Sequence, residues 1–130
     1  LFCFMIQVET GSFCLSGLLF ARVNGEVFVD IKYGLSDYSQ CPAGFDCKIH
    51  TGFFEGYSSL NKGDAITENL KIMAANHPSA KIMITGISLG GALAAVASHD
   101  ILLSLERKSM KRQVMVYTFG QPRIGNKDLA

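Results

Sequence analysis

One feature of the sequence limits the possible folds of this chain more than any other. It is a short apolar run that ends at a glycine-flanked serine and is followed at once by an alanine-rich stretch. Residues 80–86 (AKIMITG) form a continuous apolar run of strand length, typical of a strand covered on both faces in a parallel sheet. Residues 88–108 (SLGGALAAVASHDILLSLERK) have the small and apolar residues of a buried helix. Only a tight turn is left between them, so the sequence predicts a strand, a sharp turn at Ser88 and a helix.

Other segments extend this order of strands and helices. The sequence predicts strands over 1–8, 25–34 and 113–120, a turn-rich surface loop over 35–47, and a long amphipathic helix over 53–76 that is loosened at Gly63. Strands that alternate with helices indicate an α/β fold, a mostly parallel sheet with flanking helices on both faces. Reactive groups in such sheets gather at the carboxyl ends of the strands, where Ser88 lies.

Length and charge limit the organisation and the partners. The chain has 130 residues, 48% of them hydrophobic, which predicts one domain over 1–130. Twelve basic and eleven acidic residues give a net charge of +1, so no nucleic-acid partner is expected. The chain begins at Leu1 with a segment that has neither the basic region of a signal peptide nor the length of a membrane span. We therefore expect no transmembrane segment and interpret the chain as part of a longer protein.

The chain has four cysteines, and two of them close a short segment. Cys41 and Cys47 enclose CPAGFDC, a spacing that favours a disulfide loop and with it a secreted or lumenal location. Two buried free thiols are the alternative. Zinc would need a second pair of ligands, and no such pair appears, so no metal site is expected.

The residues around Ser88 indicate a nucleophile. Gly86-Ile87-Ser88-Leu89-Gly90 fits Gly-x-Ser-x-Gly, in which glycines allow a strained strand-to-helix turn that leaves the hydroxyl exposed. The Leu89 N–H, at the start of the helix, would then donate to an oxyanion. A helix–sheet packing site of small residues and a phosphate cradle are the alternatives, but no nucleotide-binding glycine motif accompanies this one.

Three segments together resemble the class 3 lipases, the fungal-type triacylglycerol lipases. GISLGGALA is similar to their serine turn, KIHTGFFEGY (48–57) to their Val-His-x-Gly-Phe segment, and YTFGQPRIGN (117–126) to their Thr-Phe-Gly-x-Pro-Arg-Val-Gly-Asn segment. The resemblance covers about residues 45–130. It implies an α/β-hydrolase fold, a serine esterase acting on acylglycerols or related esters, a transient contact with a lipid interface, and no cofactor.

The chain departs from this family at two places. Ile87 stands where these lipases usually have histidine, which should change the support of the turn rather than the chemistry. The family's Phe-Arg-Gly-Ser or Phe-Arg-Gly-Thr segment, source of the second oxyanion donor, has no clear counterpart; Ser36 is the candidate for that position.

The residues after Ser88 do not complete a catalytic triad. His99 and Asp100 lie eleven and twelve residues along the predicted helix, about 16–18 Å from its start, and Glu106 is further still. Asp128 follows the next strand and is a candidate acid, although the resemblance puts the acid after a further strand, beyond residue 130. His50 and His77 precede the serine and are expected to be structural or exposed.

The sequence therefore predicts a serine ester hydrolase whose acid and base lie outside this chain. A catalytically inert lipase-like module used for binding or scaffolding is the alternative.

Overall fold

The computed structural model describes residues 4–10, 13–15, 34–107, 110 and 113–129. Its elements are β1 (Phe4–Thr10), β2 (Phe13–Leu15), β3 (Leu35–Asp37), β4 (Lys48–His50), α1 (Thr51–Leu60), a 3-10 turn η2 (Lys62–Asp64), α2 (Ala65–Asn76), β5 (Lys81–Ile87), α3 (Leu89–Glu106) and β6 (Val114–Phe119). The strand predicted over 25–34 lies outside the described residues except for its last position.

The main sheet has the strand order β2-β1-β5-β6. β5 and β6 are parallel, with Ile84 opposite Val116, and α3 connects them, which confirms the predicted strand–helix–strand unit. β1 is confirmed as a strand but runs antiparallel to β5. The α/β class is confirmed, although β5–β6 is the one parallel pair among the described strands.

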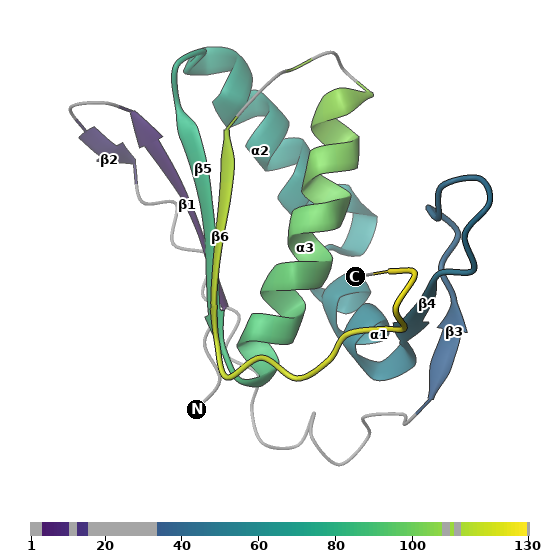
Figure 1. Cartoon of the computed structure of the whole chain (residues 1–130). Coiled ribbons are helices and arrows are strands. Elements are labelled where there is room, and N and C mark those ends of the chain that lie inside the picture. Colours follow the sequence, from purple (N-terminus) through teal and green to yellow (C-terminus); the bar gives the residue numbers. More distant parts are fainter. Residues whose placement is uncertain (1–3, 11–12, 16–33, 108–109, 111–112, 130) are drawn as a thin grey trace.

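The sequence predicts helices on both faces of this sheet, but the helices among the described residues cover only one face (Figure 1). α1, α2 and α3 all lie on one side of it (Figure 1). Burial along the strands agrees: Ile82 and Ile84 of β5 are buried toward the helices, whereas Ile87 and, in β6, Phe119 are 50% and 61% exposed. The apolar run at 80–86 is thus covered on one face by the described residues.

The helix predicted over 53–76 is two helices with a turn between them. α1 ends at Leu60, and after it Gly63 (φ 66°) and Asp64 (φ 58°) have left-handed values that redirect the chain into α2. The Asn61 side chain stabilises the start of α2, because its Oδ1 accepts hydrogen bonds from the N–H groups of Ile66 (2.8 Å) and Thr67 (3.3 Å). The predicted break at Gly63 is confirmed.

A small hairpin that the sequence analysis did not foresee precedes α1. β3 and β4 pair antiparallel, and their connection contains the Cys41–Cys47 disulfide, as predicted. Gly125 forms a bridge to Ile49 of β4 from the other side. The last described residues therefore cross from β6 to this hairpin, as the yellow segment in Figure 1 shows.

Helix α3 is the centre of the described core. By length and mean hydropathy alone it is the one described helix that could span a bilayer, but 56% of that stretch is buried inside the fold. Ala92, Ala94 and Ala97 are fully buried, and their small side chains allow α3 to lie close to its neighbours.

The disulfide gives the first testable prediction. Unfolded, unreduced protein should contain two fewer titratable thiols than the reduced protein, and peptide mapping should join the peptides of Cys41 and Cys47. A Cys41→Ser/Cys47→Ser double variant is the control. It lacks this disulfide, so reduction should not add the two thiols. Four free thiols in protein made under oxidising conditions would contradict the pairing.

Candidate active site

Ser88 lies at the junction of β5 and α3 in a strained backbone conformation. Its φ of 53° and ψ of −123° fall where residues with a side chain rarely occur, at a cost of about 1–3 kcal/mol. Three hydrogen bonds hold it: its N–H donates to the Phe119 carbonyl (2.8 Å), and its carbonyl accepts from the N–H groups of Gly91 (2.9 Å) and Ala92 (3.2 Å). The sharp turn predicted at Ser88 is present.

The requirement for glycine at position 86 has a direct steric cause. A Cβ on Gly86 would lie 2.1 Å from the carbonyl oxygen of Gly90 and 2.7 Å from the backbone nitrogen of Gly91. The end of β5 and the first turn of α3 therefore touch through backbone atoms. Sequence reasoning had not singled out Gly91, where a Cβ would lie 3.2 Å from the Cβ of Gln121 and 3.4 Å from that of Thr118.

The first turn of α3 offers backbone donors beside the serine. Leu89 is the first residue of the helix, so its N–H has no intrahelical acceptor, and no described residue accepts from it. The helix dipole adds partial positive charge at this end. The turn is thus suited to hold an oxyanion formed at Ser88. Ser36 lies in β3 opposite Ile49, and its role as a second donor stays a prediction.

His99 and Asp100 lie far along α3, in agreement with the helical spacing. The helix is continuous from Leu89 to Glu106, so both residues are about three turns from Ser88. His99 Nδ1 and the Tyr38 hydroxyl share a hydrogen bond (2.7 Å). The Asp100 carboxylate accepts from the Tyr57 hydroxyl (2.8 Å) and from Asn61 Nδ2 (3.2 Å). Both side chains therefore connect α3 to other parts of the fold, His99 to Tyr38 and Asp100 to the end of α1.

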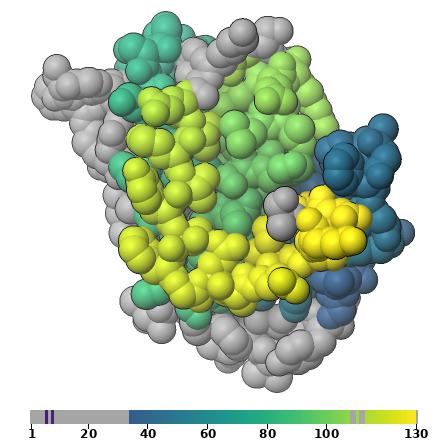
Figure 2. Space-filling model, viewed as in Figure 1, coloured from purple at the N-terminus to yellow at the C-terminus, as the bar shows by residue number. Residues whose placement is uncertain are grey.

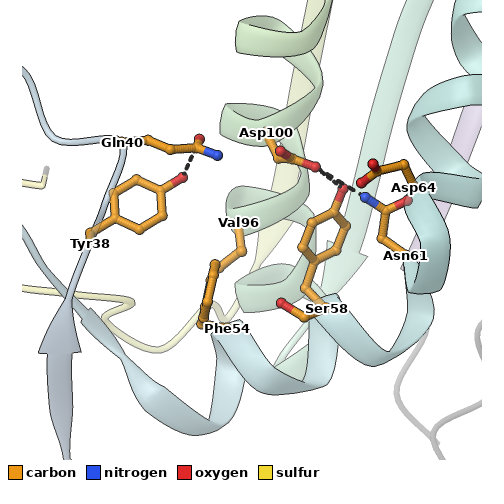
Figure 3. Close-up of a pocket in the computed structure, with 9 residues that line it drawn as sticks. Tyr38, Gln40, Phe54, Ser58, Asn61, Asp64, Val96 and Asp100 are labelled. Carbon is orange, nitrogen blue, oxygen red and sulfur yellow. Dashed lines mark hydrogen bonds between the residues drawn. The ribbon is translucent and has the colours of Figure 1, made fainter.

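These contacts surround a small pocket that is not the serine site. Figure 3 shows Asp100 beside Asn61, and Tyr38 pointing to Gln40. The pocket that these residues line has a volume of about 160 Å³. Burial and, secondarily, the nearby Asp100 carboxylate raise the pKa of Tyr38 to about 12. Burial and the hydrogen bond to Asp100 also raise the pKa of Tyr57. Both phenols therefore stay neutral near pH 7 and act as hydrogen-bonding groups.

The remaining candidate acid, Asp128, and the two histidines that precede Ser88 lie in other parts of the fold. The Asp128 carboxylate accepts from the N–H of Asp46 (3.2 Å), inside the disulfide loop. The His50 ring stacks on Phe53, with ring centroids 4.0 Å apart, and its buried Nδ1 has no described partner. His77 follows the last turn of α2. No hydrogen bond among the described residues joins a carboxylate or an imidazole to Ser88.

The described residues also bring no metal-binding group together. Among them, no three His, Cys, Asp or Glu side chains lie close enough to hold a metal ion. The chemistry available at the turn is that of a hydroxyl group beside backbone donors.

A strained serine between a sheet strand and a helix N-terminus is a feature of the α/β-hydrolase fold, and the solved structures that this chain resembles have that fold. The chain belongs to the class 3 lipase family, whose model, described as Lipase (class 3), matches residues 22–130.

Relatives and solved structures agree with this family. The chain is 32% identical over 115 residues to a lipase of Rhizopus oryzae, covering 87% of this chain and 28% of the relative. It is 46% identical over 65 residues to Triacylglycerol lipase OBL1 of Arabidopsis thaliana, covering 50% of this chain and 12% of the relative. The crystal structure of the lipase from Rhizopus microsporus var. chinensis superposes with a TM-score of 0.66 at 28% identity, over 85% of this chain and 37% of that one.

The chain thus spans well under half the length of these relatives. One further structural neighbour (TM-score 0.59, 27% identity, 78% of this chain and 36% of that chain) is described as a triacylglycerol lipase whose catalytic centre is a serine protease triad.

The steric contact at Gly86 gives a stability prediction. Gly86→Ala should lower the free energy of unfolding by about 3 kcal/mol, because the new methyl group meets backbone atoms that cannot move without unwinding the first turn of α3. Urea denaturation measures the change. Gly56→Ala is the matched control: its Cβ would meet only a Leu93 side-chain carbon at 3.4 Å, and alanine favours the helix, so a change under about 1 kcal/mol is expected. Equal losses in both variants would refute the steric account.

Proposed function

We propose that this chain is the nucleophile-bearing part of a serine ester hydrolase of lipase type, acting on acylglycerols or related carboxylic esters. The observation that carries the proposal is the strained conformation of Ser88 between Gly86 and the N-terminus of α3. The relatives named lipase and triacylglycerol lipase support the substrate class.

The proposed chemistry begins with attack by Ser88. A base takes the proton of the hydroxyl group, the serine oxygen bonds to the ester carbonyl carbon, and the charge that develops on the carbonyl oxygen is stabilised by the Leu89 N–H. The tetrahedral intermediate collapses, the alcohol leaves with the proton, and water then releases the acid from the acyl-enzyme. Ser36 is the proposed second donor to the oxyanion.

The base and the acid that orients it are proposed to lie outside these 130 residues. His99 and Asp100 are three helical turns away, and Asp128 is bound to the disulfide loop. Asp128 is the weaker candidate for the acid within the chain. The proposed partner is a lipid or other ester substrate, met in transient contact with a lipid interface, and no cofactor takes part.

The surroundings of Ser88 and the disulfide add to this proposal. Ile87, beside the serine, is 50% exposed, so the site presents apolar surface of the kind that an ester substrate with a hydrocarbon chain contacts. The Cys41–Cys47 disulfide supports a secreted or lumenal location.

An inert lipase-like binding module is the second candidate. Two observations favour it: Ile87 stands where the family usually has histidine, and the family's Phe-Arg-Gly-Ser or Phe-Arg-Gly-Thr segment has no clear counterpart in this chain.

Covalent labelling of the full-length protein tests the nucleophile. An alkyl fluorophosphonate should modify Ser88, since the base that activates the hydroxyl toward an ester also activates it toward phosphorus. Mass spectrometry of the labelled peptide identifies the site, and Ser88→Ala is the control. Ile87→His should keep labelling, because it restores the residue usual in the family. If the full-length protein is folded but Ser88 is not modified, the result would favour the inert binding module.

Turnover by the 130-residue chain alone tests the placement of the acid and base. Hydrolysis of p-nitrophenyl butyrate should be slower than that of the full-length protein by about three orders of magnitude or more, because only the oxyanion donors and binding remain. Fast turnover by the short chain that is lost in Ser88→Ala and in Asp128→Asn would place the acid at Asp128 and overturn this part of the proposal.

A further inference from the structure

The segment after β6 joins the proposed nucleophile to the disulfide hairpin. We call residues 120–129 the arm. The Phe119 carbonyl, one residue before the arm, accepts the hydrogen bond from the Ser88 N–H. Gln121 then lies against Gly91, in the first turn of α3. In Figure 2 the arm (yellow) crosses the visible face from β6 to the blue segment that contains β4 and the residues before it.

Asn126 fixes the far end of the arm to β4. Its N–H donates to the Lys48 carbonyl (3.0 Å), and its side-chain Oδ1 accepts from the Lys48 N–H (3.0 Å) and from the Leu129 N–H (3.2 Å). Its Nδ2 donates to the Asp46 carbonyl (2.5 Å). A single amide side chain thus serves as acceptor and donor to the strand and to the residue that precedes Cys47.

The contacts on either side of Asn126 leave the arm little freedom to slide. The Ile124 carbonyl accepts from the His50 N–H (2.7 Å), and a Cβ on Gly125 would lie 2.3 Å from the Lys48 carbonyl oxygen. On the other side, the Asp128 carboxylate accepts from the N–H of Asp46. The arm is therefore fixed at one end against the Ser88 turn and at the other end against β4.

The disulfide closes the loop on which the arm is fixed. Asp46 lies between Cys41 and Cys47. Its carbonyl accepts the hydrogen bond from Asn126 Nδ2, and its N–H donates to the Asp128 carboxylate. Cys47 is buried, whereas Cys41 is half-buried and residues 42–46 are exposed. Without the bond, this exposed loop would depend on its few hydrogen bonds to keep Asp46 in place.

From this chain of contacts we infer that Asn126 is a positioning residue for Ser88, with the Cys41–Cys47 loop as its fixed support. The arm holds the Phe119 carbonyl in line with the Ser88 N–H, and Asn126 holds the arm. The inference rests on the proposed role of Ser88 for its catalytic meaning, whereas the positioning itself is a property of the backbone.

Amide hydrogen exchange on the oxidised full-length protein tests the positioning without reference to activity. Asn126→Asp keeps the shape and the acceptor but removes the Nδ2 donor and places a negative charge against the Asp46 carbonyl. Exchange at the Ser88 N–H should rise about tenfold, while the amides of Ile82 and Ile84 in β5 keep their protection. Asn69→Asp is the matched control, because it removes an amide donor to the Ala65 carbonyl on the exposed side of α2.

Reduction of the disulfide provides a second, reversible test. A dithiol such as dithiothreitol supplies two electrons and two protons, so that Cys41 and Cys47 become thiols and the dithiol becomes a cyclic disulfide. Exchange at the Ser88 N–H should rise on reduction and return on reoxidation. If Asn126→Asp unfolds the domain and exposes the β5 amides as well, the response of the Ser88 N–H to reduction and reoxidation tests the inference in the unmutated protein.

Fluorophosphonate kinetics separate positioning from binding. In Asn126→Asp the maximal rate of labelling at Ser88 should fall about tenfold, while the probe concentration that gives half of that rate stays the same. If exchange rises only over residues 46–50 and the Ser88 N–H keeps its protection on both substitution and reduction, the inference is wrong. If wild-type Ser88 refuses the label yet its exchange responds as expected, the positioning holds and the proposed function fails.

Discussion

The contact between the end of β5 and the first turn of α3 is the constraint on which the rest of the structure depends. Gly86 and Gly90 approach so closely that a methyl group at position 86 would lie 2.1 Å from a carbonyl oxygen. This contact forces the Ser88 backbone to a positive φ and sets the direction in which α3 leaves the sheet. Because α3 contributes much of the buried core, the direction of that one helix decides where α1 can pack.

Polar contacts fix the other end of α3. Asp100 accepts from Tyr57 of α1 and from Asn61 in the turn, and His99 bonds to Tyr38 next to the disulfide loop. Since burial raises the pKa of both tyrosines above the ordinary value of 10.0, these phenols stay neutral and able to donate even in alkaline solution. The helix is thus held at its N-terminus by backbone contact and at its C-terminal half by side-chain hydrogen bonds.

Local patterns in the sequence predicted the parts of the fold that depend on local causes. The apolar run of β5, the Gly-x-Ser-x-Gly turn and the small residues of α3 each reflect a short-range requirement, and the structure has a sharp turn at Ser88 with an N–H of α3 free beside it. The break at Gly63 was likewise readable, because a left-handed φ is a property of a single residue.

Long-range pairing could not be read in the same way. β3 and β4 have three residues each, too few to show a periodic pattern, and the antiparallel direction of β1 depends on contacts far along the chain. The cover on one face of β5 was also missed, since a continuous apolar run looks the same whether one face or both are covered. The sequence does not indicate the role of Asn126, because that role depends on Lys48 and Asp46, which lie about 80 positions earlier in the chain.

The geometry of α3 also explains why this helix can offer Ser88 backbone donors but not a base. Side chains on a helix move away from its N-terminus by about 1.5 Å per residue, so His99 and Asp100 cannot return to Ser88 unless α3 breaks. What the helix supplies at its start is unpaired N–H groups and partial positive charge, which suit an oxyanion. The base of the proposed nucleophile must therefore belong to a segment other than α3 that reaches the carboxyl ends of the strands. In the described residues, the arm after β6 passes that edge and carries its carboxylate, Asp128, away to the disulfide loop.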